Sequence, residues 1–130
     1  MATTSQPGYG RQFDKRHAVA VTATAAVTKH RFVAYDGAHA PAAPASGAKD
    51  SQGVAEESAA LGEAFSVVTD YSYLVEASEA IAFGAYVKPA ADGSGKAAVG
   101  TLTDHCGRAL GIAGAAGNLV EVEILKHVHA

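Results

Sequence analysis

Three consecutive residues, Asp104, His105 and Cys106, are of the types that cysteine hydrolases use as orienting carboxylate, base and nucleophile. Neighbours in a strand or a turn cannot orient one another in those roles, which are filled by side chains from separate parts of a chain. We therefore interpret Cys106 as a small, half-buried filler of the core. Because it is the one cysteine present, an internal disulfide and a zinc site with several cysteines are excluded.

A second set of candidate ligands lies at the end of the chain. His127 and His129 are two positions apart on the last expected strand, so their rings project from the same face. Two imidazoles make a weak metal site, and a third ligand would have to come from residues 104–106. We expect solvated histidines at a frayed terminus and no bound metal.

Two glycine-rich segments suggest nucleotide binding but lack the required residues. Residues 90–97 end in Gly-Lys, yet a phosphate-binding loop needs glycine in place of Ala90 and a hydroxyl residue in place of Ala97. Residues 111–117 have glycine at every third position, whereas the dinucleotide fingerprint separates its first two glycines by one residue. Both segments are predicted to be turns, the first a hairpin loop, and no cofactor is expected.

The net charge of −3 is unevenly distributed. Residues 1–35 carry five basic residues against one acidic residue, and residues 36–130 carry five basic against twelve acidic residues. A basic end on an acidic body favours contacts between neighbouring copies or docking on an acidic surface, although an uneven, solvated charge pattern is the alternative. The acidic body disfavours direct nucleic-acid binding.

Hydrophobic residues make up 48% of the chain, but 30 of them are alanines and only 26 are Val, Ile, Leu or Phe. We expect one domain with a small core. No run approaches the roughly 18 apolar residues of a membrane span, and the N-terminus lacks the basic and apolar stretches of a signal peptide. We expect no membrane partner and synthesis in a cytoplasm.

Hydrophobic periodicity predicts an extended arm followed by a β-rich domain. Residues 1–17 show neither helical nor strand periodicity and are predicted to form the arm, which can reach a neighbouring molecule. Residues 18–130 form the domain: strict alternation begins at Ala18, and short apolar runs then recur about every ten residues between turn signals. This pattern predicts an all-β fold, a small barrel or sandwich.

Two segments depart from the strand pattern. Residues 36–53 are rich in Ala and Pro and are predicted to be a surface loop, because Pro41 and Pro44 cannot donate to a strand ladder. Residues 56–62 have helix-favouring composition and could form the one short helix, ended by Gly62.

Two parts of the domain have similar sequence patterns, which suggests an internal repeat. In the first part, Gly53–Ala55 is followed by an Ala-Gly turn ending at Gly62 and then by a strand. In the second part, Gly111–Ala113 is followed by a similar turn ending at Gly117 and then by a strand. We interpret them as two similar strand-turn-strand units of one barrel, with chance similarity in an Ala/Gly-rich chain as the alternative.

These glycine-apolar-alanine units, together with the strand entry Gly84–Lys88 before an Asp-Gly hairpin and the step Gly62-Glu63, resemble the capsid cement (decoration) proteins of tailed bacteriophages over roughly residues 17–125. The resemblance implies a small, non-enzymatic β-rich protein that binds the outer surface of an assembled capsid. We expect it at junctions between major capsid protein subunits, with neighbouring copies forming a homo-oligomer on the shell.

The arm is then the expected contact with the capsid and with neighbouring copies. Tyr9 and Phe13 are the expected apolar anchors, with a place in the core as the competing role for Phe13. Arg11, Lys15 and Arg16 are expected to meet acidic capsid surface and to make attachment sensitive to salt.

The alternative function is a small β-barrel module on a phage particle that binds host glycan or mediates adhesion. Tyr71 and Tyr73 are the one close pair of aromatic residues that could support it, and in a strand they share a face. An enzyme ranks third, because reviving it would need a deep polar pocket.

Overall fold

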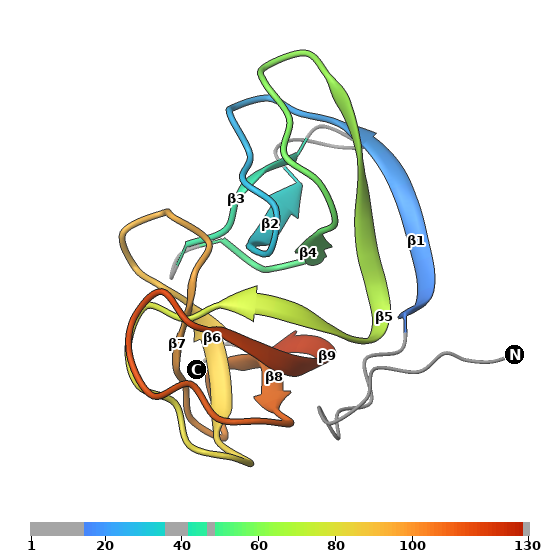
Figure 1. The fold of residues 1–130 in the computed structure, drawn as a ribbon. Coiled ribbons are helices and arrows are strands. Elements are labelled where there is room, and N and C mark those ends of the chain that lie inside the picture. Colours follow the sequence, from blue (N-terminus) through green and yellow to red (C-terminus); the bar gives the residue numbers. More distant parts are fainter. Residues whose placement is uncertain (1–14, 36–41, 47–48, 129–130) are drawn as a thin grey trace, which may run out of the picture.

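The computed structural model describes residues 15–35, 42–46 and 49–128 (Figure 1). They form one antiparallel sheet of nine strands that closes nearly into a barrel, and none of them is helical, which confirms the predicted all-β fold. No helix long and apolar enough to cross a membrane therefore exists among these residues. The strands are β1 Lys15–Thr22, β2 Phe32–Tyr35, β3 Ala42–Pro44, β4 Gly53–Ala55, β5 Ala64–Glu76, β6 Tyr86–Pro89, β7 Ala97–Val99, β8 His105–Ala109 and β9 Leu119–Val128.

Strand β5 organises the sheet. The order is β3-β2-β4-β5-β9-β8-β6-β7, and β1 also pairs with β5. The first part of β5 lies between β1 and β4, and its last part, Ser72–Glu76, pairs with β9. At Tyr71, where the two parts meet, φ is 65°. Figure 1 shows the strand turning sharply between these two parts.

The two parts of β5 belong to two similar halves, residues 15–71 and residues 72–128. In the first half Val27 and Ala59 exchange backbone hydrogen bonds, and in the second half Ile81 and Ala113 do the same 54 positions later. The glycine turns also correspond, with φ of 88° at Gly62 and 91° at Gly117. The chain therefore contains two copies of one supersecondary unit.

This correspondence corrects the register of the predicted internal repeat. The turns ending at Gly62 and Gly117 do match, but the counterpart of Gly53–Ala55 is the segment Gly107–Ala109 and not Gly111–Ala113. Strands β4 and β8 begin the matching units, and residues 111–113 instead lie at the Ile81–Ala113 bridge. Sequence letters alone could not distinguish the two alignments, because Gly-X-Ala occurs at both places.

One further expectation was wrong, and one possible helix does not form. Residues 42–44 form β3 within the predicted surface loop, since Pro44 lies opposite Val33 in a strand that pairs only with β2 among the described residues. At such an edge a proline removes no ladder hydrogen bond. Residues 56–62 form no helix, because Ala59 is drawn into the bridge to Val27.

The core is assembled from small side chains in two clusters. One contains residues of the first half, among them Val21, Phe65 and Val67. The other fills the second half and also contains residues of the first half, namely the fully buried Phe32 with Ala34, Ala45 and Val54. The two halves therefore share a core, as expected for domains this small.

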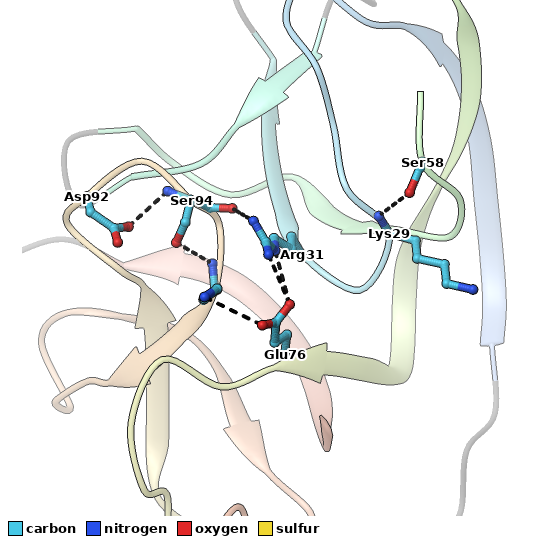
Figure 2. A network of polar contacts seen from close by, with 7 residues as sticks. Lys29, Arg31, Ser58, Glu76, Asp92 and Ser94 are labelled. Atoms are coloured by element: carbon cyan, nitrogen blue, oxygen red, sulfur yellow. Dashed lines mark hydrogen bonds and ion pairs between the residues drawn. The ribbon is translucent and has the colours of Figure 1, made fainter. Parts of the chain in front are cut away.

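A network of polar side chains closes the joint between the halves (Figure 2). Arg31 of the first half forms an ion pair with Glu76 at 3.0 Å, and Lys96 approaches the other oxygen of the same carboxylate at 3.5 Å. The backbone carbonyl of Gly95 accepts a hydrogen bond from the Phe32 amide at 2.8 Å. A side chain at Gly95 would lie 2.5 Å from the Phe32 carbonyl oxygen, so glycine is required for this approach.

Glycines also permit close contact between strands at equivalent places in the two halves. A Cβ atom added at Gly53 would overlap the Val68 carbonyl oxygen, and one added at Gly107 would lie 2.5 Å from Val122 Cγ1 and 2.6 Å from the Glu123 carbonyl oxygen. Neither backbone oxygen can move without breaking the sheet. We infer that these glycines are needed for packing.

The first prediction concerns Gly107. The substitution Gly107→Ala should lower the free energy of unfolding by about 2 kcal/mol or more, because the added methyl group overpacks the sheet. Urea denaturation followed by circular dichroism measures this change. The control is Gly114→Ala, whose Cβ would have its nearest neighbour at 3.7 Å and should change stability by less than about 0.5 kcal/mol. Equal stability of the two variants would contradict the packing argument.

The second prediction concerns Glu76. Burial tends to raise the pKa of its carboxyl, but hydrogen bonds and attraction from Arg31 and Lys96 outweigh burial and lower it. A lowered folded-state pKa stabilises the fold above the unfolded value, near 4.5, and this contribution is lost as pH falls through the folded value. Glu76→Gln should therefore lose about 1 kcal/mol at pH 7, and its difference from the wild type should shrink in acid.

Urea midpoints measured between neutral and acidic pH test this expectation. The exposed Glu57 provides the control substitution, Glu57→Gln, which removes a carboxylate outside the joint. A Glu76→Gln deficit that stays constant with pH would rule out the ion pair as its origin.

Candidate functional site

The predicted arm residues lie mostly beyond the described part of the chain. Tyr9, Arg11 and Phe13 fall outside the described residues, and Lys15 and Arg16 are the first residues of β1. Lys15 lies opposite Tyr71, and the register of β1 on β5 shifts between Lys15 and residue 18. The roles of these five residues stay predictions.

An open groove of about 410 Å³ lies next to the start of β1. It is lined by residues from three places: Asp50, Ser51 and Gln52 before β4, Thr69 and Asp70 in β5, and Ile124–His127 in β9. The pairing of His17 with Asp70 places the start of β1 beside this groove, whose charged lining residues are Asp50, Asp70 and Lys126.

Residues 104–106, whose types are those of a cysteine hydrolase, have separate structural roles. Asp104 forms an ion pair with Lys88 at 3.2 Å, and the His105 ring hydrogen bonds to the Thr101 carbonyl at 3.0 Å. Cys106 is 1% exposed and belongs to the core, more deeply buried than expected. These neighbours do not act together on one accessible atom.

His127 was expected to be solvated, and this was wrong. Its side chain is 2% exposed, and its Nδ1 accepts a hydrogen bond from the Ser51 amide at 2.6 Å. Its Nε2 lies 4.0 Å from Asp104 Oδ1. The ring therefore ties the end of β9 to the segment before β4 and lies near Asp104, just before β8. His129 falls outside the described residues.

The contact between His127 and Ser51 was missed because nothing in the sequence relates residues 76 positions apart. The alternation of β9 does signal that one face of this strand is buried, but not how far burial continues toward the terminus. In the described part of the chain, no group of three or more His, Cys, Asp or Glu side chains is placed to hold a metal ion.

Large apolar side chains at the turns form exposed surface that the sequence analysis did not single out. Phe83 and Ile112 are 67% and 71% exposed, and both adjoin the bridge between Ile81 and Ala113. Leu61 and Leu102 are similarly exposed at other turns. Single exposed apolar side chains are normal on a protein surface, so the neighbouring Phe83 and Ile112 are the stronger candidates for a contact with another molecule.

The equivalent turn of the first half is polar. Lys29 and Ser58 stand where the second half has Phe83 and Ile112, and the Lys29 amide donates to Ser58 Oγ at 3.0 Å (Figure 2). At this turn, the apolar character thus belongs to the second half only. Alignment of the two halves in the correct register would have revealed this difference.

The aromatic pair considered for glycan binding does not form a shared platform. Tyr73 is partly buried against the core and stacks on His30 with ring centroids 5.7 Å apart. The positive φ at Tyr71 interrupts the alternation that would have placed both rings on one face.

The comparisons with known proteins decide the family. A family model described as phage cement protein matches residues 12–124. The chain belongs to the phage cement protein family. This confirms the resemblance drawn from the glycine-apolar-alanine units, and it identifies a structural protein of the phage virion that associates with the capsid.

The fold of this cement protein is also found in a solved structure. The head fiber gp8.5 N base of bacteriophage phi29 matches with a TM-score of 0.70 and 19% sequence identity, covering 88% of this chain and 98% of that one. At this identity the match shows a shared fold. A search of curated proteins finds no match.

The third prediction concerns the thiol of the cement protein. Burial raises the pKa of Cys106, the nearby Asp104 carboxylate raises it further, and a hydrogen bond with Ser51 opposes both. The thiol is therefore protonated and inaccessible at pH 8. Alkylation by iodoacetamide at this pH should be roughly 100-fold slower in the folded protein than in denaturant. Mass spectrometry measures the rates, and fast labelling of the folded protein would contradict a buried, protonated thiol.

Proposed function

We propose that this cement protein binds the outer surface of a phage head at junctions between major capsid protein subunits and stabilises the shell without catalysing a reaction. The observation that carries the proposal is the family match, which extends over residues 12–124 and gives the capsid decoration role. The protein is made in the cytoplasm of the host bacterium and then attaches to the head.

The described residues support a role that depends on surface contacts. The residue types that could perform chemistry are used to hold strands together: Cys106 fills the core, and His127 joins β9 to residue 51. The core itself consists largely of Val and Ala. A domain with such a core gains stability from any partner that binds its folded state.

The arm is the proposed clamp. Its basic residues Arg11, Lys15 and Arg16 face acidic capsid surface, which makes attachment weaker at high salt. Tyr9 and Phe13 enter apolar sites on the shell or on a neighbouring copy, because aromatic side chains carry a large share of interface energy. Each copy contributes a modest interface, and repetition over the closed shell raises the free energy needed to separate capsomers.

The fourth prediction tests the clamp by removing residues 2–14. This deletion ends before Lys15 and leaves all of β1 in place. Binding to undecorated shells, measured by co-sedimentation, should weaken by more than about tenfold, because the apolar anchors are lost. The urea midpoint of the free protein should stay the same. Unchanged affinity of the truncated protein would disprove the clamp.

Point variants separate the two roles considered for Phe13. Tyr9→Ala combined with Phe13→Ala should reproduce most of the loss of affinity, while Gln6→Ala combined with Gln12→Ala serves as the matched control. If Phe13→Ala alone lowers the urea midpoint, Phe13 belongs to the core and is not an anchor. Binding of the isolated protein to a glycan array, with no affinity for shells, would instead favour the adhesion module.

A further inference from the structure

The outer edge of β5 in the second half is covered by a turn of the first half. The Glu76 amide donates to the His30 carbonyl at 2.8 Å, and the His30 ring Nδ1 hydrogen bonds to the Leu74 carbonyl at 3.1 Å. Arg31, the next residue, adds the ion pair with Glu76. The turn 30–31 thus satisfies backbone groups that an edge strand would otherwise expose.

The equivalent edge in the first half belongs to β1. The 54-residue correspondence places Ala20 and Thr22 where the second half has Leu74 and Glu76. The amide of Ala23 donates to Glu63 at 2.8 Å, so alternation directs the backbone groups of Val21 toward β5 and those of Ala20 and Thr22 outward. Within the described ranges, β1 has β5 as its one partner strand.

The turn equivalent to residues 30–31 is the turn at Gly84 and Ala85. Both turns have a positive φ, 66° at His30 and 82° at Gly84. The His30 amide donates to Ala55 at 2.9 Å, and the Gly84 amide donates to the equivalent Ala109 at 2.8 Å. The backbone therefore presents the same shape at both places.

Each chain thus has two such turns and two such edges, but the described residues unite only one turn with one edge. The turn in the second half docks on no strand edge among the described residues, and its Gly84 carbonyl accepts a long hydrogen bond, 3.4 Å, from the exposed Arg108 side chain, which a docking strand would displace. This turn follows the exposed Phe83 directly and lies near Ile112, where the first half carries Lys29 and Ser58. Apolar side chains beside a turn that can dock favour burial against another molecule.

We propose that the Gly84–Ala85 turn of one copy docks on the outer edge of β1 of a second copy, as the turn 30–31 docks on β5 within each chain. The partner is a second copy because the chain itself provides both surfaces in the geometry of its internal joint. The contact is head to tail, so every copy offers one turn and one edge, and a ring forms where the rotation between copies closes. The inference goes beyond shell binding, and the protein alone tests it.

The test transfers the internal ion pair to the contact between copies. Thr22 and Ala85 correspond to Glu76 and Arg31, so Thr22→Glu and Ala85→Arg together should create the same pair between chains. Sedimentation equilibrium should show concentration-dependent association of the wild type. The double variant should associate about two- to fivefold more tightly, as an exposed ion pair allows, and lose this gain at high salt.

Mixing the two single variants, Thr22→Glu and Ala85→Arg, distinguishes head-to-tail docking from other arrangements. An equimolar mixture should associate more tightly than either single variant alone, because neither single variant carries both the added carboxylate and the added guanidinium. Thr22→Glu combined with Ala115→Arg, a substitution at an exposed residue of another turn, is the matched control and should show no gain. Equal association of the mixture and the single variants would overturn the proposal.

A proline tests the edge directly. Thr22→Pro removes the outward amide that corresponds to the Glu76 amide and leaves the ladder bonds of Val21 and Ala23 intact, so it should abolish association of a folded protein. If this variant does not fold, the charge variants decide. A wild type and double variant that both stay monomeric at the highest soluble concentration would overturn the inference. Association that requires residues 2–14 and ignores the charge pair would assign the edge to the arm and also overturn it.

Discussion

The structure depends on the burial of Phe32 from the first half in the core of the second half. Each half has too few large side chains to bury an adequate core alone. The two halves share β5 and a buried cluster in which Phe32 is the largest first-half member, and they thereby form one nine-stranded sheet over one core. The close approach of Gly95 to Phe32 and the ion pair between Arg31 and Glu76 follow from this joint, because both lie at its rim.

The joint also explains which surfaces remain for partners. Side chains that could act as nucleophiles, bases or metal ligands, such as His127 and Cys106, instead join strands or fill the core. Among the described residues, the exposed features are an edge of β1 with no second partner strand, apolar side chains at turns such as Phe83, and a groove lined by Asp50, Asp70 and Lys126. Such features suit a protein of the phage cement family, and the same fold occurs in a head fiber base at 19% identity.

Local patterns predicted the strands well where each strand has one buried face. The alternation beginning at Ala18 and the hairpin around the glycines of residues 90–97 appear in the structure as β1 and as the β6–β7 connection. The structure departs from the local pattern where a distant partner overrode a local preference. Pro44 is accepted in β3 because that strand is at an edge, and Ala59 leaves a helix-favouring segment to bridge Val27.

The sequence by itself determined the all-β class, the turn positions and the family, because period-two alternation, glycine spacing and short motifs are properties of neighbouring residues. Only the tertiary structure decided the true register of the repeat, the burial of His127 and the joint at Phe32. These depend on contacts between residues far apart in the chain. In a chain rich in Ala and Gly many registers look alike, and the one that forms is set by which backbones can approach closely enough to pack.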